Sequence, residues 1–367
     1  MLPTAPAERV ALAPLCTLGV GGPARWFARA GSIDALRAAL VWCGERGIEP
    51  FVLGGGSNLV ISDAGWPGLV LAPTLRGVSF ALEGDAVRVT AAAGEPWDAL
   101  VESCVARGLA GIECLSGIPG SVGGTPIQNV GAYGQEVATT IDAVTVLDRR
   151  DASARRIRGA ECGFAYRQSR FKREDAGRCI VLEVEFLLRP GGAPTLAYPE
   201  LVAALAGSEA TLAAARAAVL ALRRRKGMVL DAADPDTRSV GSFFMNPVVD
   251  AGQHAALRDD AGQPAPSFAA GPSDRPLSRV KVPAAWLIER AGLAKGHARG
   301  AVGLSTKHPL AIVNRGGATA AEVVAFAREV QRRVADRFGI VLLAEPTFVG
   351  FGADDPSHGA IVALRGG

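Results

Sequence analysis

The chain has 367 residues, a length that predicts two or three domains. It is 49% hydrophobic and 20% charged, which favours a globular core and argues against wholesale disorder. Lys and Arg number 39 against 36 Asp and Glu, and a net charge of +3 is too small for a non-specific nucleic-acid binder. The 45 glycines lack the period of collagen and cluster in turns between apolar runs, which indicates backbone brought close to a ligand.

The composition also argues against membrane, disulfide and metal-dependent classes. No stretch approaches the ~20 uncharged apolar residues that span a bilayer, and no signal peptide is visible. The six cysteines contain no Cys-x-x-Cys pair, and several lie in apolar patterns typical of buried thiols. The four histidines are too dispersed to indicate a metal site. We therefore expect a cytoplasmic protein without a metal centre or a membrane partner.

In chain order, the first 75 residues alternate between helix and strand. Ser32 is a helix cap, so a helix is expected over 33–46, ending at Gly47. A short strand at 51–53 then runs into a glycine-rich turn. Later strands are expected at 69–71, 86–92, 143–147 and 179–188, and later helices at 95–107 and 211–225.

The C-terminal part adds one further helix with a clear start. Thr319 and Glu322 form a capping box for a helix that runs to about 337 and ends at Gly339. A strand is expected at 340–343 directly after it. The whole pattern predicts an α+β protein with a nucleotide-type domain first and a smaller C-terminal domain.

The standard nucleotide motifs do not fit. In a dinucleotide fingerprint that starts at Gly54, the third glycine would fall at position 59, which is Leu59. Gly19 and Gly21 fit a relaxed form, but a strand-like stretch follows them where a helix is required. The chain also contains no phosphate-binding P-loop. The usual dinucleotide folds are therefore disfavoured.

Two other glycine-rich segments remain, which we call the first glycine turn (residues 54–58) and the second glycine turn (residues 118–124). Glycines permit positive φ and leave amides facing outward, and successive amides form concave anion sites. Two such turns that converge could hold a pyrophosphate. Either turn alone is typical of ordinary tight turns, and for the pair the two interpretations stand level.

These turns, with the motifs around them, resemble the UDP-N-acetylenolpyruvoylglucosamine reductase (MurB) family, flavoenzymes of bacterial peptidoglycan precursor synthesis. The resemblance covers residues 17–350. It rests on Gly-Gly-Gly-Ser-Asn at 54–58, Ile-Pro-Gly-Ser-Val-Gly-Gly at 118–124, Pro-Ile-Gln-Asn-Val-Gly-Ala-Tyr-Gly at 126–134, Phe-Ala-Tyr-Arg at 164–167, Gly-Ser-Phe-Phe-Met-Asn-Pro-Val at 241–248, and Glu345. Six ordered motifs are very improbable by chance, although each alone is weak.

The resemblance implies a two-subdomain FAD-binding fold of the vanillyl-alcohol-oxidase (PCMH) type, followed by an α+β substrate-binding domain. That fold cradles the pyrophosphate between two loops, which explains why the fingerprint test fails. The implied boundaries are 1–77 and 78–226 for the FAD-binding subdomains and 227–347 for the substrate-binding domain. The tail 348–367 is expected to pack on the first subdomain.

The implied activity is reduction of the enolpyruvyl group of UDP-N-acetylglucosamine enolpyruvate to UDP-N-acetylmuramate. NADPH is the implied hydride donor, with non-covalent FAD as cofactor and a monovalent cation as a further aid. The implied partners are small molecules alone, with neither nucleic acid nor membrane, and a cytoplasmic monomer is expected. A flavin oxidase of the same fold, acting on an alcohol or sugar, and a non-catalytic FAD or sugar-nucleotide binder are the alternatives.

The resemblance also assigns contacts residue by residue. Substrate contacts fall on Tyr198, Lys226, Asn246 and Lys281. The cofactor contacts are Gly54, Gly55, Gly56, Ser57, Asn58, Ile118, Pro119, Gly120, Ser121, Gly123, Gly124, Gln128, Asn129, Gly131, Tyr133 and Gly134. The chain departs from its relatives around Arg299 and at Thr347, so the substrate details there differ.

Three residues match the family's catalytic positions. Arg167 has a guanidinium suited to a carboxylate, although its polar stretch is also typical of a surface arginine. Glu345 could share a proton with an enediolate or simply pair with a basic side chain. Ser242 is by chemistry alone more typical of a plain turn, and only the resemblance makes it a proton donor. The neighbouring pair Phe243 and Phe244 is expected to pack in the core.

Overall fold

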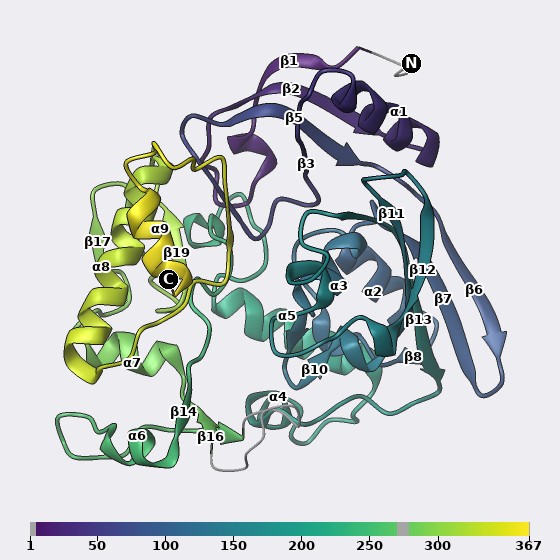
Figure 1. The fold of residues 1–367 in the computed structure, drawn as a ribbon. Coiled ribbons are helices and arrows are strands. Elements are labelled where there is room, and N and C mark those ends of the chain that lie inside the picture. The colour runs from purple at the N-terminus through teal and green to yellow at the C-terminus, as the bar shows by residue number, and fades with distance from the viewer. Residues whose placement is uncertain (1–4, 270–278, 367) are drawn as a thin grey trace. The chain divides into compact units, whose positions relative to one another are not determined.

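The computed structural model describes residues 5–269 and 279–366, and the described chain divides into two compact units (Figure 1). Unit 1 holds the described residues up to Val10, Ala24–Gly56 and Pro67–Val229. Unit 2 holds Ala11–Pro23, Ser57–Trp66 and the described residues from Leu230 onward.

Unit 1 begins with a four-stranded sheet in the order β1-β2-β5-β3. Its strands are β1 (Ala7–Ala11), β2 (Pro23–Ala30), β5 (Trp66–Pro73) and β3 (Pro50–Val52). Helix α1 (Ile33–Gly44) starts where predicted, because the Ser32 hydroxyl accepts a hydrogen bond from the Ala35 amide at 3.1 Å. The buried face of α1 packs on this sheet and also on Leu147, Ile180 and Leu182 of the next one.

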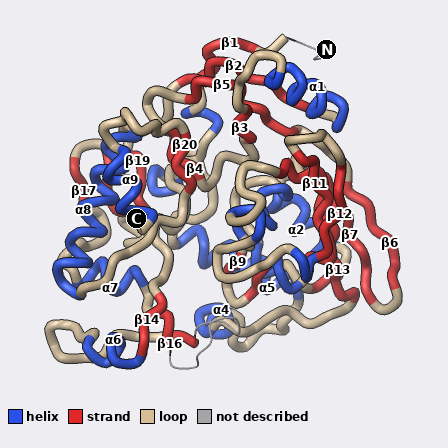
Figure 2. Tube along the Cα trace, in the orientation of Figure 1, coloured by secondary structure: helices blue, strands red, loops and turns tan. Residues whose placement is uncertain are grey.

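The second sheet of unit 1 has the strand path β12-β11-β13-β7-β6 (Figure 2). Strand β8 also pairs with β13, and neighbouring strands of this sheet run antiparallel. Its strands are β6 (Val78–Glu83), β7 (Ala86–Ala92), β8 (Leu109–Ala110), β11 (Ile141–Asp148), β12 (Ala154–Arg158) and β13 (Cys179–Pro190). Helix α2 (Trp97–Ala106) packs on it through Trp97, whose ring lies 5.9 Å from that of Phe186. The remaining elements of unit 1 are α3 (Thr125–Gln128), β9 (Gly131–Ala132), β10 (Gln135–Glu136), α4 (Pro199–Ala204) and α5 (Leu212–Arg225).

Unit 2 is built around helix α8 (Ala320–Phe338), whose Thr319–Glu322 capping box forms as predicted. Buried side chains of α8 share a core with strands and helices from the whole unit, including the adjacent pair Phe243 and Phe244, which are 0% and 1% exposed. The strands are β4 (Leu59–Ile61), β14 (Val248–Asp250), β15 (Phe268–Ala269), β16 (Arg279–Lys281), β17 (Ala298–Arg299), β18 (Val302–Leu304), β19 (Ile312–Asn314) and β20 (Thr347–Val349). The other helices are α6 (Ala251–Ala256), α7 (Ala284–Arg290) and α9 (His358–Arg365).

One expectation about the C-terminal region needs correction and another stays open. The described part of the tail lies in unit 2, where β20 pairs with β4 of the segment 1–77 and where Ile361 and Leu364 of α9 belong to the core around α8; its packing on the first subdomain stays a prediction. The predicted strand at 340–343 is wrong: this segment is irregular. Its carbonyl groups are taken by other partners, since Leu342 accepts from the Gln331 side chain at 2.6 Å and Leu343 from the Met245 amide at 2.9 Å. The boundary between the two FAD-binding subdomains stays a prediction.

The cysteines are free thiols, and five of the six are buried, with Cys179 half-buried, as expected for small apolar side chains. Among residues 5–269 and 279–366, no helix combines the length and the apolar character needed to cross a membrane. Within the same residues, no group of three or more His, Cys, Asp and Glu side chains is placed to hold a metal ion.

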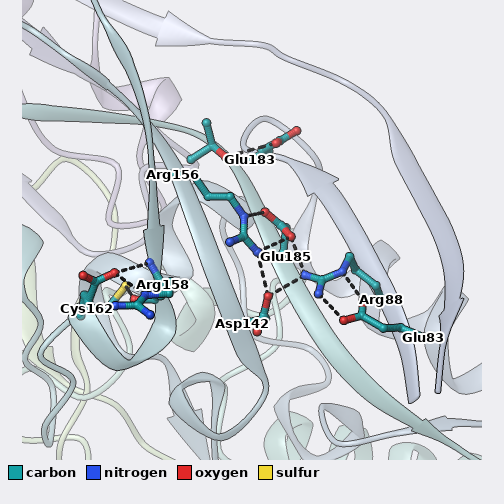
Figure 3. Close-up of polar contacts among 10 residues, drawn as sticks. Glu83, Arg88, Asp142, Arg156, Arg158, Cys162, Glu183 and Glu185 are labelled. Atoms are coloured by element: carbon teal, nitrogen blue, oxygen red, sulfur yellow. Dashed lines mark hydrogen bonds and ion pairs between the residues drawn. The ribbon is translucent and has the colours of Figure 1, made fainter. Parts of the chain in front are cut away.

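A network of charges crosses all five strands of the larger sheet's path (Figure 3). Arg88 donates to Glu83, to Asp142 at 2.6 Å and to Glu185 at 2.5 Å. Arg156 donates to the same two acceptors, Asp142 at 2.8 Å and Glu185 at 2.6 Å. The hydrogen bond from Arg88 lowers the pKa of Asp142, and the one from Arg156 lowers the pKa of Glu185.

We expect Arg88→Gln to lower the free energy of unfolding by about 1–3 kcal/mol at pH 7, the range for lost hydrogen bonds to charged groups. A carboxyl whose pKa is lowered by folding stabilises the protein above its unfolded pKa of roughly 4, and this contribution disappears as the pH falls through the folded pKa. In urea titrations the deficit should therefore stay constant from pH 7 to about pH 5 and shrink as the pH falls below about 4. Arg158→Gln, at an exposed pair with Glu161, is the control; a deficit that does not change with pH contradicts the explanation.

Candidate active site

The two glycine turns come into direct contact in unit 1. A Cβ built on Gly55 would lie 2.5 Å from the Gly120 Cα, and one on Gly54 would lie 3.2 Å from the Ser121 hydroxyl. Gly54 and Gly55 are themselves exposed. The sequence left open whether these were unrelated tight turns; the structure brings their backbones together at a separation that only glycine allows.

The second glycine turn is hydrogen-bonded to the first residue of α2 and to the segment just before that helix. The Gly120 carbonyl accepts from the Trp97 amide at 3.1 Å, and the Gly123 amide donates to the Ala93 carbonyl at 2.9 Å. A Cβ on Gly123 would lie 2.7 Å from the Ala93 Cβ, so this glycine is needed for packing, while Gly124 has open space around it. Ile118 and Pro119, which open the turn, are half-buried.

The segment after this turn forms α3 and the β9–β10 hairpin, which carry the remaining predicted cofactor residues. Gln128 accepts from the Lys172 ammonium at 2.9 Å. Asn129 is fully buried with a left-handed φ of 43°, and its side chain bonds Glu136, the Ala165 carbonyl and the Ala138 amide. The Asn129 side chain therefore holds the backbone of this region in place. Gly131, Tyr133 and Gly134 line the hairpin that follows.

Arg167 stands at the tip of a two-residue turn beside that hairpin. Ala165 and Gln168 pair through both of their backbone hydrogen bonds, which leaves Tyr166 and Arg167 at the tip. Arg167 has a positive φ of 55°, a conformation that costs a non-glycine residue energy and is found mostly where the surroundings fix it. Its guanidinium donates to the Gly131 carbonyl at 3.0 Å, which places this charge next to the predicted cofactor residues.

Three of the predicted contact residues also cluster in unit 1. The rings of Tyr133 and Tyr198 meet edge to face at 5.3 Å, and the Lys226 ammonium lies 5.6 Å from the Tyr133 ring centre. Lys226 also pairs with Glu200, two residues beyond Tyr198. Burial raises the pKa of Tyr133 to about 12, so its hydroxyl stays protonated at neutral pH.

In unit 2, the backbone brings Ser242 and Glu345 together. The Glu345 amide donates to the carbonyl of Phe243 at 2.8 Å, and Phe244 pairs with Ala344 in an isolated bridge. Asn58 of the first glycine turn joins them, because its side-chain amide donates to the Glu345 carbonyl at 3.4 Å. Ser57 precedes it at the start of the unit 2 segment that becomes β4. The backbone next to Ser242 and the backbone of Glu345 therefore lie side by side in this unit.

The other two predicted substrate residues lie further along unit 2. The Asn246 side chain accepts from the Ala284 amide at 2.9 Å and so holds the start of α7. Lys281 is half-buried in β16, where it pairs with Val248. The structure therefore gives Asn246 a demonstrated local role besides the one that the resemblance implies.

Two residues near Arg167 were not assigned from the sequence. Lys172 donates to the Arg167 carbonyl at 3.2 Å as well as to Gln128 and so joins the two segments; its position shortly after the matched motif at 164–167 was the available signal. Arg223 donates to the Met228 carbonyl at 2.8 Å, and burial lowers its pKa to about 10. Arg223 lies in a run of four basic residues, a pattern typical of an exposed helix end. Nothing in the sequence therefore predicts that Arg223 is more buried than its exposed neighbours Arg224 and Arg225.

Comparisons with known proteins agree on one family. A family model described as the C-terminal domain of UDP-N-acetylenolpyruvoylglucosamine reductase matches residues 234–349, and one described as an FAD binding domain matches residues 24–158. The enzyme of that name from Thermobifida fusca is 48% identical over 94% of this chain and 98% of its own. The one from Salinispora arenicola is 50% identical over 91% of this chain and 93% of its own.

A solved structure gives the same result. The crystal structure of UDP-N-acetylenolpyruvylglucosamine reductase (MurB) from Thermus caldophilus matches 93% of this chain and 98% of its own with a TM-score of 0.62 and 28% identity. The expected α+β fold, an FAD-binding region followed by a C-terminal domain, is confirmed by this match and by the two family models. The chain belongs to the UDP-N-acetylenolpyruvoylglucosamine reductase family.

Proposed function

We propose that this chain reduces the enolpyruvyl group of UDP-N-acetylglucosamine enolpyruvate to UDP-N-acetylmuramate, with NADPH as the hydride donor, as a step of peptidoglycan synthesis. Family membership over nearly the full length supports this activity. The structural observation that carries it is the contact between the two glycine turns, which suits a diphosphate-bearing cofactor.

The two turns fit the FAD that the family model describes. When bound, FAD supplies the capacity to accept a hydride from NADPH and to pass it to the substrate's vinyl carbon. The chain's contribution is to hold the cofactor's diphosphate, and the exposed backbone of Gly54 and Gly55, close to Gly120, is suited to that charge because backbone amides attract anions. We propose that the binding is non-covalent.

On the substrate, the chain must stabilise a carboxylate that gains charge and must deliver one proton to the carbon that bears it. We assign the first task to Arg167, a permanent charge whose forked donors match a carboxylate. Its bond to the Gly131 carbonyl and its fixed turn keep the guanidinium oriented before substrate binds. Such preorganisation means that little reorganisation is needed as charge develops.

We assign the proton to the Ser242 hydroxyl and a supporting role to Glu345. A serine hydroxyl is a weak acid, so it can act only toward a strongly basic intermediate and only when held within hydrogen-bond reach. The bond from the Glu345 amide to the Phe243 carbonyl, and the buried aromatic pair behind it, support a fixed position for Ser242. The Glu345 carboxyl could then hydrogen-bond the enediolate or share its proton.

Tyr198, Lys226, Asn246 and Lys281 are proposed contacts for the sugar nucleotide. We also propose that the chain works in the cytoplasm as a monomer and that a monovalent cation raises its rate. Size-exclusion chromatography and rates measured with potassium or with a bulky organic cation test these two points. A dimer, or rates without any cation dependence, would contradict them.

The visible spectrum tests the proposed activity directly. The protein should purify yellow, and acid denaturation should release intact FAD. Without air, NADPH should bleach the visible absorbance of the flavin, and the enolpyruvyl sugar nucleotide should restore it. Rapid reoxidation by oxygen with an alcohol or sugar as reductant would favour an oxidase. A colourless protein that cannot take up FAD, or flavin that stays attached after acid, would contradict the cofactor assignment.

Lys226→Ala is expected to weaken the binding of both NADPH and the sugar nucleotide, each by roughly tenfold, because one lost charged hydrogen bond to phosphate has about this effect. Parallel lines in initial-rate plots are expected if the two ligands use one site in turn. Arg225→Ala, at the exposed neighbour, is the control. Intersecting lines, or a loss of affinity for one ligand alone, would argue against a shared role.

A further inference from the structure

Glu113 is a fully buried carboxylate between β8 and the second glycine turn. Its Oε2 accepts from the Gly111 amide at 2.7 Å, and its Oε1 accepts from the Gln135 side chain at 2.7 Å and the Thr195 amide at 2.8 Å. Among the described residues, no Lys or Arg pairs with it. Three neutral donors thus offset the large cost of burying this charge.

Thr195 is hydrogen-bonded in this cluster through its amide, its hydroxyl and its carbonyl. Besides its amide bond to Glu113, its hydroxyl accepts from the Gln135 side chain at 2.8 Å, and its carbonyl accepts from the Cys114 thiol at 3.2 Å. Gln135 in turn accepts from the Cys114 amide at 2.8 Å. All three polar groups of Thr195 are therefore fixed by residues 60 or more positions earlier in the chain.

Thr195 leads directly into the segment that carries a proposed substrate contact. A Cβ on Gly134 would lie 2.9 Å from the Ala197 Cβ, so the segment lies tightly against the β9–β10 hairpin. Tyr198 then meets Tyr133 of that hairpin edge to face at 5.3 Å. The position of the Tyr198 ring thus depends on how Thr195 is anchored.

A carboxylate is the side chain that suits this place. Three N–H groups converge on Glu113, and a carboxylate accepts from all of them without presenting a donor of its own. A glutamine here would turn its amide group toward at least one of these donors. The three N–H donors therefore explain why position 113 holds a glutamate, although a glutamine of the same size would fit there.

We propose that Glu113 is a positioning residue for the substrate: through Thr195 it locks the 195–198 segment onto the β9–β10 hairpin and so sets the place of Tyr198. The Glu113 side chain is fully buried, so the role assigned to it is positional and needs no contact with substrate or cofactor. The inference rests on the proposed function for the role of Tyr198, but the anchoring itself is independent of that function.

The first variant is Glu113→Gln, which replaces one acceptor oxygen with a donor. The second is Thr195→Val, an isosteric change that removes the hydroxyl to which the Gln135 side chain donates. The second variant keeps the inference testable if the first fails to fold. The control is Asp148→Asn, which alters another buried carboxylate of unit 1, one held by Arg155 and Arg178. The first readout is amide hydrogen exchange over residues 191–200 of the FAD-loaded protein. Exchange should accelerate there in both variants and stay unchanged in the control.

The second readout is ligand affinity. Glu113→Gln should raise the dissociation constant for the enolpyruvyl sugar nucleotide by roughly tenfold, the effect of about one charged hydrogen bond, while the saturated rate of flavin reduction by NADPH stays at the wild-type value. In a Tyr198→Ala background, Glu113→Gln should have little further effect, because both changes act through one side chain. Asp148→Asn should lower the melting temperature and leave the affinity unchanged.

Unchanged exchange over 191–200 in both variants would overturn the anchoring. Equal losses of affinity in the wild-type and Tyr198→Ala backgrounds would overturn the action through Tyr198. If the wild-type protein itself binds no sugar nucleotide, the proposed function fails, while the exchange result still decides the anchoring.

Discussion

Ser242→Ala is expected to slow reoxidation of the pre-reduced protein by the enolpyruvyl substrate by ~10²–10⁴-fold, the range for a lost general acid. Reduction of the flavin by NADPH should stay near the wild-type rate, because that half-reaction needs no proton at this position. The measurement is rapid mixing without air, with each half-reaction followed separately at the flavin absorbance. Binding of the sugar nucleotide should change little, since one hydroxyl contributes little to the affinity for so large a ligand.

Variants of Arg167 and Glu345 show whether the effect of Ser242→Ala is that of a lost proton donor. Arg167→Ala and Glu345→Gln should also slow the second half-reaction, with an added loss of substrate affinity for Arg167→Ala. The three losses should fall well short of additivity, because the residues serve one transition state. Reoxidation of Ser242→Ala at the wild-type rate, or an equal slowing of both half-reactions, would remove Ser242 from the proposed role.

Elements whose signals are local were predictable from the sequence. The strand at 86–92 matches β7 at both ends, and the caps at Ser32 and Thr319 mark the true starts of α1 and α8. Such signals depend on residues within one turn or strand, so they do not require knowledge of which distant segments come into contact. The strand expected at 340–343 failed because its carbonyl groups bond to Gln331 of α8 and to the Met245 amide, which no local pattern reveals.

The proposed site was predictable where one motif carries it and unpredictable where distant segments meet. The contact between Gly55 and Gly120 was a hypothesis from two separate turns, and the structure supplied the distance. The bond between Glu113 and Thr195 joins residues 82 positions apart, and Glu113 had no sequence signal beyond a single acid in an apolar run. Nor did composition place residues 57–66 with the C-terminal unit, since that grouping depends on the parallel pairing of β4 with β20.

The contact between the glycine turns predicts the other large effect. In Gly55→Ala the added methyl carbon would meet the backbone of Gly120 at 2.5 Å, so the turns must separate. Overpacking of this kind costs about 1–3 kcal/mol, and because the diphosphate is proposed to depend on both turns, the affinity for FAD should fall by roughly 10- to 100-fold. Gly44→Ala, where a Cβ meets nothing within 4 Å, is the matched control and should retain its FAD. The difference is measured as flavin content after gel filtration and by fluorescence titration of the apoprotein. Wild-type affinity for FAD in Gly55→Ala would show that the cofactor does not need the two turns to stay in contact.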